Sequence, residues 1–370
     1  MTGAEQIVRG MLEQAGVEVN GSRPWDIQVH DDHLYGRVLR YRNLGLGESY
    51  MEGWWDCGQL DEFFRRILSE GLDTPDTNRI SAGLTLLWEM INNPQSRSRS
   101  SLIAEKHYNL GNDLFFSFLD PYHQYSCGYF NGTDDLNRAQ ERKLDLICRK
   151  LCLERGDHLL DIGCGWGGLA RYAAERYGCQ VTGVNISAEQ IRHARAACKD
   201  LPVEILEMDY RDIQGDFDKI VSVGMFEHVG RRNYRTFMEV VDRCLKPDGI
   251  FLLHTIGGNE SRDRTDPWIS KYIFPIGMLP TMNHIGKSYE NIFVLEDVHN
   301  LGPHYDRTLM AWHDNFQREW DGLPGKDEVF RRMWEYYLLS CAGAFRARTI
   351  QLWQLVFTKV GAPHPACRLV

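Results

Sequence analysis

The segment LDIGCGWGG, residues 160–168, has the spacing of a ligand-binding turn. Gly163, Gly165 and Gly168 fit the GxGxxG pattern, in which glycines let the backbone come close to a bound nucleotide. Asp161 stands directly before these glycines. A carboxylate does not suit a pyrophosphate, since both are negative, but it suits a ligand that carries positive charge. The turn therefore indicates a site for a cationic cofactor.

S-adenosylmethionine meets this requirement, because it carries an ammonium group and a positive sulfur and has no phosphate. A nicotinamide dinucleotide would instead favour an acidic residue roughly 20 positions further on, where this chain has Asn185. We expect the ribose to face Asn185 and Gln190, and the adenine to face Asp209, Tyr210 and Arg211. The competing interpretation is a plain strand-to-helix turn that needs its glycines for packing alone.

Two polar residues interrupt apolar segments further along the chain. Glu227 lies in VSVGMFEHV and His254 lies in GIFLLHTI. A carboxylate in such surroundings is rarely buried without a partner. Both residues follow predicted parallel strands, at the carboxyl edge where open α/β sheets bind ligands. Taken alone, His254 would be a satisfied core histidine and Cys127 a small buried residue.

The elements that position these residues alternate along the chain. A helical stretch at 135–153 leads into strands predicted at 158–163, 180–185, 203–208, 218–223 and 249–256 and helices at 168–177, 188–198 and 234–245. Strands separated by helices indicate βαβ units and a parallel sheet. We therefore predict an α/β fold, with an open, mostly parallel, doubly wound sheet and helices on both faces. Residues 293–298 and 353–358 could add edge strands.

A polar segment divides the chain. Residues 92–101, NNPQSRSRSS, lack apolar side chains and have the composition of a linker. We predict an N-terminal, mainly helical domain at 1–91, a linker at 92–101 and a catalytic domain at 102–370.

The N-terminal domain shows helical patterns and one glycine-rich turn region. The helices are predicted at 4–15, 60–68 and 81–91, and the turn region at 44–55. That region includes Tyr50, Met51, Trp54 and Trp55. This cluster is either the core of the domain or an exposed patch that meets lipid or a second subunit.

Composition limits the class of protein. With 43% hydrophobic and 25% charged residues among 370, the chain is globular rather than collagen-like or disordered. It shows neither an apolar run of roughly 20 residues nor a signal peptide, so we expect a cytoplasmic location. The 10 cysteines show no CxxC pair, which predicts reduced thiols and no metal site. A net charge of −9 disfavours nucleic acid as a partner.

Several segments together resemble the bacterial cyclopropane-fatty-acyl-phospholipid synthases and, more distantly, the mycolic acid cyclopropane synthases. They are GLGESYMEGWW (45–55), KHYNLGNDLFFSFLDPYHQYSCGYF (106–130), LDIGCGWGGLA (160–170), VSVGMFEHVG (221–230), LLHTIG (252–257), DPWISKYIFP (266–275), TLMAWH (308–313) and CAGAFRARTIQLWQ (341–354). The glycine turn is shared by many methyltransferases, whereas the combination of YSC, FEHVG and LLHTIG is far more specific.

The resemblance implies a class I S-adenosylmethionine-dependent methyltransferase fold. It also implies an activity that adds the cofactor's methyl carbon across a cis double bond in a phospholipid acyl chain, giving a cyclopropane ring and S-adenosylhomocysteine. An alkene is a poor nucleophile, so alignment must enforce the transfer, and water must be kept from the resulting carbocation. Ring closure then needs a base, which in this family is bound bicarbonate.

The resemblance also carries over individual site residues. It implies that bicarbonate is held by Cys127, Glu227, His254, the backbone of Ile256, and Tyr305. For S-adenosylmethionine it implies contacts from Tyr108, Tyr125 and Ser126, which close over the cofactor, and from Gly163, Gly165 and Gln190, and we add Asp161 and Trp166 from the turn itself.

The implied substrate lies in a bilayer, although the chain is acidic. Contact with the membrane must therefore be peripheral and local. Candidate basic patches are Arg97 with Arg99, Arg231 with Arg232 and Arg235, and Arg346 with Arg348. For any single one of them, an ordinary solvated face is the favoured interpretation. The resemblance further implies a homodimer, with the N-terminal domain serving dimerisation and lipid association.

Two other functions stay open at this point. A methyltransferase of the same fold that acts on an amine or a lipid head group would need no bicarbonate site. A membrane-surface interaction protein with a vestigial cofactor turn would not bind the cofactor at all.

Overall fold

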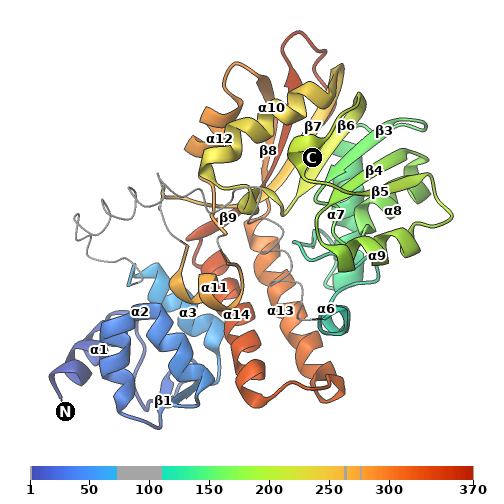
Figure 1. Ribbon diagram of the computed structural model, residues 1–370. Coiled ribbons are helices and arrows are strands. Elements are labelled where there is room, and N and C mark those ends of the chain that lie inside the picture. The colour runs from blue at the N-terminus through green and yellow to red at the C-terminus, as the bar shows by residue number, and fades with distance from the viewer. Residues whose placement is uncertain (1, 73–110, 262–264, 276, 370) are drawn as a thin grey trace. The chain divides into compact units, whose positions relative to one another are not determined.

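The computed structural model describes residues 2–72, 111–261, 265–275 and 277–369 (Figure 1). The chain divides into two compact units. We call them the helical unit, which comprises 1–92, 262–276 and 305–350, and the sheet unit, which comprises 93–261, 277–304 and 351–370. The predicted linker, 92–101, and the predicted helix at 81–91 lie outside the described residues.

The sheet unit is built on one seven-stranded sheet in the order β5-β4-β3-β6-β7-β9-β8. The strands are β3 (His158–Ile162), β4 (Gln180–Asn185), β5 (Val203–Glu207), β6 (Phe217–Val223), β7 (Leu245–Gly258), β8 (Phe293–Asn300) and β9 (Ile350–Lys359). Strands β3 to β7 pair in parallel and β8 pairs antiparallel with β9. The predicted α/β class with a mostly parallel sheet is confirmed.

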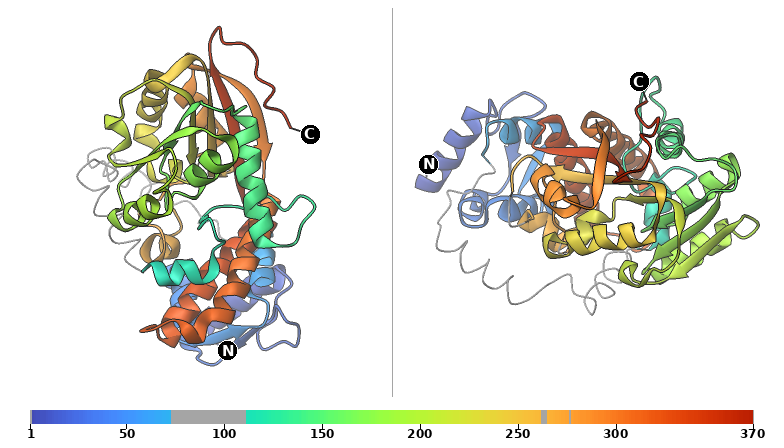
Figure 2. Two further views of the ribbon diagram at one scale, coloured as in Figure 1. Left: turned by 90° about the vertical axis from the view of Figure 1, so that its right-hand side faces the viewer. Right: turned by 90° about the horizontal axis from the view of Figure 1, so that it is seen from above.

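Of the two predicted edge strands, 293–298 and 353–358, the second is not at an edge of the sheet. β8 is the edge, but β9 lies between β7 and β8, as Figure 2 shows for the β8–β9 pair. Residues 351–358 are all buried, on both faces of the sheet. Such continuous burial is typical of an interior strand.

Helices cover both faces of this sheet (Figure 1). They are α7 (Leu136–Lys150), α8 (Gly168–Tyr177), α9 (Ala188–Ala197), α10 (Tyr234–Cys244) and α12 (Met282–Tyr289). The unit also contains α6 (Asn112–Phe118) and the single turns η1 (Tyr210–Asp212), η2 (Phe226–His228) and η3 (Arg231–Asn233). Leu160 and Ile162 of β3 pack with α10 and α12, whereas Leu159 packs with α7 and α8. Alternate residues of the strand therefore fill two separate cores.

The helical unit holds the N-terminal elements together with segments from late in the chain. Its elements are α1 (Gly3–Gln14), β1 (Ile27–Val29), α2 (His33–Met51), β2 (Trp55–Cys57), α3 (Leu60–Ser69), α11 (Pro267–Tyr272), most of α13 (Gly302–Glu319), η4 (Trp320–Gly322) and α14 (Glu328–Arg346). Arg346 pairs with Asp61 of α3 at 2.6 Å and with Asp306 of α13 at 2.8 Å. Segments 265–275 and 305–350, predicted within 102–370, thus group with 2–72.

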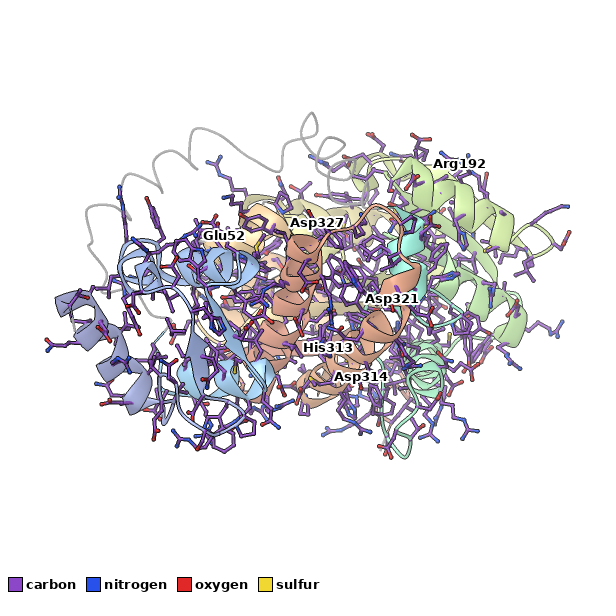
Figure 3. The ribbon with its side chains drawn as sticks, turned by 90° about the horizontal axis from the view of Figure 1, so that it is seen from below. Glu52, Arg192, His313, Asp314, Asp321 and Asp327 are labelled. Atoms are coloured by element: carbon purple, nitrogen blue, oxygen red, sulfur yellow. The ribbon has the colours of Figure 1, made fainter. Side chains whose placement is uncertain are left out.

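Figure 3 shows how α13 and α14 present polar side chains within this unit. His313 and Asp314 lie on α13, and His313 Nε2 is 3.5 Å from the Glu335 carboxylate on α14. Asp327 accepts a hydrogen bond from the Phe330 N–H at 2.9 Å and so caps α14.

The predicted turn region at 44–55 is wrong for most of its length, because residues 44–51 belong to α2. Gly47 is there for close packing: a Cβ at this position would lie 2.5 Å from the Trp268 ring. The predicted aromatic core is confirmed, since Tyr50, Met51 and Trp55 are buried. Tyr50 packs against Trp55 with ring centroids 5.1 Å apart. Among the described residues, no helix combines the length and apolarity that crossing a membrane requires.

Candidate active site

The glycine turn links β3 to α8, as predicted. Gly163 has φ +85° and its N–H donates to the Val184 carbonyl on β4. A Cβ at Gly163 would lie 2.8 Å from the side chain of Met225, so only glycine fits. Gly165 also has positive φ, +54°, but no described atom lies within 4 Å of its notional Cβ. The backbone at Gly165 therefore faces open space that a ligand can fill.

Asp161 lies in β3, beneath this turn, and is buried. Its Oδ2 has no hydrogen-bond partner among the described residues. Burial raises the pKa of Asp161 to about 7, and the positive charge of Lys143 acts in the opposite direction. An orphaned carboxylate oxygen fits the predicted cationic ligand, because a positive group beside it would restore its ionised form.

The predicted ribose contacts lie together. Asn185, at the end of β4, donates through Nδ2 to the Gln190 side chain at 2.9 Å. The same Nδ2 donates to the Gly165 carbonyl at 3.2 Å. The structure thus brings Asn185 and Gln190 to the glycine turn, as the sequence indicated.

The residues predicted to face adenine, Asp209, Tyr210 and Arg211, contact one another or neighbouring side chains. Both oxygens of Asp209 accept hydrogen bonds from the Arg211 guanidinium, at 2.8 and 2.9 Å. Tyr210 is buried and packs against Phe237 of α10, with centroids 5.4 Å apart. Their role toward adenine stays a prediction.

Helix α6 lies against the turn. Trp166 donates from Nε1 to Asn112 Oδ1 at 3.0 Å and packs against Phe115 at 5.2 Å between centroids. Phe115 also packs edge-on against Tyr125, at 5.1 Å. Two predicted cofactor residues thus share one aromatic cluster, whereas Tyr108 lies outside the described residues.

Glu227 lies in η2, after β6, and is almost wholly buried. Its Oε1 accepts a hydrogen bond from the Ile256 N–H at 2.6 Å, and its Oε2 has no partner among the described residues. Burial raises the pKa of Glu227 to about 7, with hydrogen bonds from the backbone and from Thr255 opposing the shift. Near neutral pH the side chain can therefore hold a proton on Oε2 and donate it as a hydrogen bond.

His254 lies in β7 with both ring nitrogens buried. Nδ1 is 3.3 Å from Nε2 of Gln354 on β9, and Nε2 of His254 has no partner among the described residues. Burial, then the charges of Lys143 and Lys150, hold the pKa of His254 well below its usual value, so the ring is neutral. With the Gln354 NH₂ group toward Nδ1, the amide donates, Nδ1 accepts and the single ring proton lies on Nε2.

Cys127 is fully buried, with its Sγ 3.1 Å from the Gly128 carbonyl and 3.9 Å from the Leu301 carbonyl. Tyr305 lies in the helical unit, on α13, where its ring stacks on Phe345 at 4.6 Å. The structure thus joins Glu227 to Ile256 directly, and the grouping of Tyr305 with the other anion-holding residues stays a prediction.

Sequence reasoning missed two buried polar residues, Lys143 and Gln354. Lys143 falls on the apolar stripe of its helix, with Ala139 and Ile147. A charged residue at such a core position is the signal that could have found it. Among the described residues, no group of three His, Cys, Asp or Glu side chains could hold a metal ion. None of the ten cysteines forms a disulfide.

The sheet order and the glycine turn after β3 define the class I fold of the S-adenosylmethionine-dependent methyltransferases, and solved structures agree. The cyclopropane synthase MmaA2 from Mycobacterium tuberculosis is 33% identical with a TM-score of 0.66, over 70% of this chain and 98% of that one. The mycolic acid cyclopropane synthase CmaA1, complexed with SAH and CTAB, is 34% identical with a TM-score of 0.65, over 70% of this chain and 98% of that one. A coclaurine N-methyltransferase, 22% identical with a TM-score of 0.70, shares the fold alone.

The family within this class follows from the sequence comparisons. The model of the mycolic acid cyclopropane synthetase family matches residues 95–355, and the chain belongs to this family. It is 52% identical to the cyclopropane-fatty-acyl-phospholipid synthase of Escherichia coli strain K12, over 96% of this chain and 93% of that protein. It is 34% identical to a tuberculostearic acid methyltransferase of M. tuberculosis, over 90% of this chain and 82% of that protein.

Proposed function

We propose that this chain transfers the methyl carbon of S-adenosylmethionine, as a methylene bridge, across a cis double bond of an acyl chain in a phospholipid. The products are a cyclopropane fatty acyl chain and S-adenosylhomocysteine. The observation that carries this proposal is the 52% identity, over 96% of the chain, to a cyclopropane-fatty-acyl-phospholipid synthase. The match includes the N-terminal segment that precedes the family model's first residue, 95.

The cofactor site is built from the glycine turn and the strand that follows it. Gly165 leaves open space beside the backbone, and Asp161 offers an orphaned oxygen to a positive group. Asn185 and Gln190 present amides that suit ribose hydroxyls. Trp166 and Tyr125, in one cluster with Phe115, would exclude water from this side.

When bound, S-adenosylmethionine supplies the electrophilic methyl group, and bicarbonate supplies the base that takes a proton from it so that the ring closes. Neutral His254 offers an Nε2–H donor to such an anion, because Gln354 occupies Nδ1. Glu227 offers a second donor when its Oε2 is protonated, which its raised pKa of about 7 permits. Cys127 and Tyr305 complete the proposed set with a thiol and a phenol donor.

The site must also protect a carbocation. Aromatic rings attract a cation without attacking it, with about 0.5–2 kcal/mol for each ring. Among the aromatic residues of the C-terminal third, we propose Tyr305 alone for this role, as the resemblance implies.

The same proposal covers the location and the assembly. The enzyme works from the cytoplasm as a peripheral homodimer on the inner face of the membrane, and its N-terminal domain takes part in both contacts. The described residues include no helix that could span a bilayer, which is compatible with contact from one side.

Vesicles with one cis-monounsaturated acyl chain per phospholipid test the function. Incubation with the enzyme and S-adenosylmethionine should add one CH₂ to the unsaturated chains, measured by lipid mass spectrometry. Fully saturated vesicles are the control and should not change. Methylated head groups on either lipid would instead favour a head-group methyltransferase. Removal of dissolved CO₂ should slow turnover, and added bicarbonate should restore it.

A further inference from the structure

Lys143 is a buried cation in the middle of the sheet unit. It lies on α7 with no exposed surface. Its Nζ donates to Gln124 Oε1 at 2.5 Å and to Ser126 Oγ at 2.9 Å. Both acceptors are neutral, and no carboxylate of the described residues lies within ion-pair distance. A buried ammonium without a contacting carboxylate costs several kcal/mol, so its presence needs a reason.

One consequence of these contacts is that α7 fixes the segment Gln124–Cys127. Lys143 holds the side chains of Gln124 and Ser126. Gln140, one turn earlier on α7, donates to the Ser126 carbonyl at 2.8 Å. The segment contains Tyr125, from the aromatic cluster over the glycine turn, and ends at the buried thiol of Cys127. Lys143 is thus placed to position both halves of the site.

The second consequence is electrostatic. The groups whose ionised forms act on Lys143 are Asp120 first, then the Cys127 thiol and Asp161, and Lys143 in turn acts on His254. The other buried cation that acts on His254 is Lys150, which is neutralised by Asp297 at 2.7 Å.

The proposed anion site contains no cation of its own. Its side chains are a thiol, a carboxyl, a neutral imidazole and a phenol, and an anion there would be stabilised only by hydrogen bonds. Asp120, the carboxylate that acts most strongly on Lys143, already accepts hydrogen bonds from two backbone N–H groups at 2.8 Å. Lys143 is therefore a buried positive charge that no described carboxylate contacts, and its partner Ser126 directly precedes Cys127.

We propose that Lys143 is a positioning residue of the reaction, which holds residues 124–127 in place and supplies the positive charge that favours an anion beside Cys127 and His254. This inference rests on the proposed function and adds to it the source of the charge that the bound base requires.

Two variants of the full-length enzyme test this inference. Lys143→Met removes the charge and keeps a straight side chain. Gln124→Glu keeps Lys143 and its contact but neutralises the charge with a carboxylate. Turnover is measured against bicarbonate concentration in CO₂-depleted buffer, with S-adenosylhomocysteine affinity measured by calorimetry. We expect the bicarbonate concentration for half-maximal turnover to rise at least about tenfold in both variants. Cofactor affinity should change less than about threefold in Gln124→Glu, which keeps the contacts of Lys143, whereas it should also fall in Lys143→Met, which releases Ser126.

The matched control is the double variant Lys150→Met/Asp297→Asn, which removes an equally buried lysine together with its partner charge. It should leave the bicarbonate dependence unchanged. If Lys143→Met does not fold, Gln124→Glu decides, since a merely structural role for Lys143 would be satisfied by an ion pair. A bicarbonate dependence that Gln124→Glu leaves at the wild-type value would overturn the inference. Wild-type turnover that does not depend on bicarbonate would contradict the base in the proposed function and this inference together.

Discussion

The carboxylate of Glu227 accepts a hydrogen bond from the backbone N–H of Ile256 at 2.6 Å, which ties the turn after β6 to the end of β7. Only Oε1 is engaged in this way, and Oε2 faces the interior without a partner among the described residues. The contact fixes the side chain in a place where ionisation is costly, so the protonation state of Glu227 depends on pH near neutrality.

Glu227→Gln should stabilise the protein at alkaline pH. The pKa of Glu227 is raised from 4.5 to about 7, so the folded state binds the proton more tightly between these values. The side chain therefore lowers the free energy of unfolding progressively from pH 4.5 to about 7, and the penalty is complete above that. At 1.36 kcal/mol per pKa unit it reaches about 3 kcal/mol, an upper bound. Urea unfolding of the wild type and Glu227→Gln at pH 5 and pH 8.5 measures this difference in the free energy of unfolding. Turnover of Glu227→Gln should fall at least about 100-fold.

Glu239→Gln is the control for this prediction, because that glutamate on α10 is 56% exposed. Its unfolding free energy should differ from the wild type by less than about 0.5 kcal/mol at both pH values. A Glu227→Gln protein that is no more stable than the wild type at pH 8.5 would show that the carboxylate is not buried in solution.

Gln354→Met should release the tautomer of His254. With its NH₂ group toward Nδ1, the Gln354 amide donates to this nitrogen and keeps the ring proton on Nε2. Without this donor both neutral tautomers become accessible, and turnover should fall roughly 10-fold while cofactor affinity is retained. Nitrogen-15 spectra of histidine-labelled protein report the tautomer. Gln351→Met on the same strand is the control, since Gln351 bonds Asn300 instead. A ring proton on Nδ1 in the wild type would refute the assignment, and an unchanged Nε2–H tautomer in Gln354→Met would show that Gln354 does not fix it.

Gly165→Ala should weaken cofactor binding more than it weakens the fold. The positive φ of +54° costs alanine about 1 kcal/mol, and no described atom blocks its methyl group. The methyl group would instead occupy the space assigned to the ligand, so the affinity for S-adenosylhomocysteine should fall at least about 10-fold. Gly325→Ala is the control, because this glycine has φ +70° and equally open surroundings. It should lose the same stability but keep the wild-type affinity for the cofactor. Calorimetry that gives both variants the wild-type affinity would place the cofactor elsewhere.

Reversing the charges of Arg231 and Arg232 should weaken membrane association. Both side chains are exposed in η3, after β6, on a chain whose net charge is −9. A local basic patch adds about 1 kcal/mol per residue near an anionic surface. Sedimentation with anionic vesicles should show less bound Arg231→Glu/Arg232→Glu protein, most clearly at low salt. Arg192→Glu, an exposed position on α9 labelled in Figure 3, is the control. Equal sedimentation of all three proteins would exclude this patch.

The fold of the sheet unit was largely predictable from the sequence. The alternation of apolar strands and amphipathic helices predicted the ends of β3 to β7 within a few residues. This worked because the hydrophobic period of the sequence agrees with the observed burial in these elements. The helical unit was harder. Gly47 reads as a turn residue, and its helical role depends on Trp268, more than 200 residues further along the chain. Sequence pattern alone does not contain such a contact.

The candidate site was predictable in its residue types rather than in its electrostatics. Asp161 was identified from its place before the glycines, and Glu227 and His254 from strand ends, apolar context and the family resemblance. That two of them keep a buried orphaned oxygen, and the third an orphaned nitrogen, depends on the packing around them. Lys143 escaped notice because a lysine in a charged helix reads as solvent-exposed, whereas in the structure it is buried and donates to Gln124 and Ser126.

The central claim is that the methyl carbon becomes a ring methylene, and an isotope measurement tests it most directly. The enzyme is given S-adenosylmethionine with a fully deuterated methyl group and vesicles of cis-monounsaturated phospholipid. The account predicts acyl chains that gain one carbon with two deuterium atoms, and high-field ring protons in the NMR spectrum of the unlabelled product. Products that retain all three deuterium atoms, whether on a branched chain or on a head group, would contradict it.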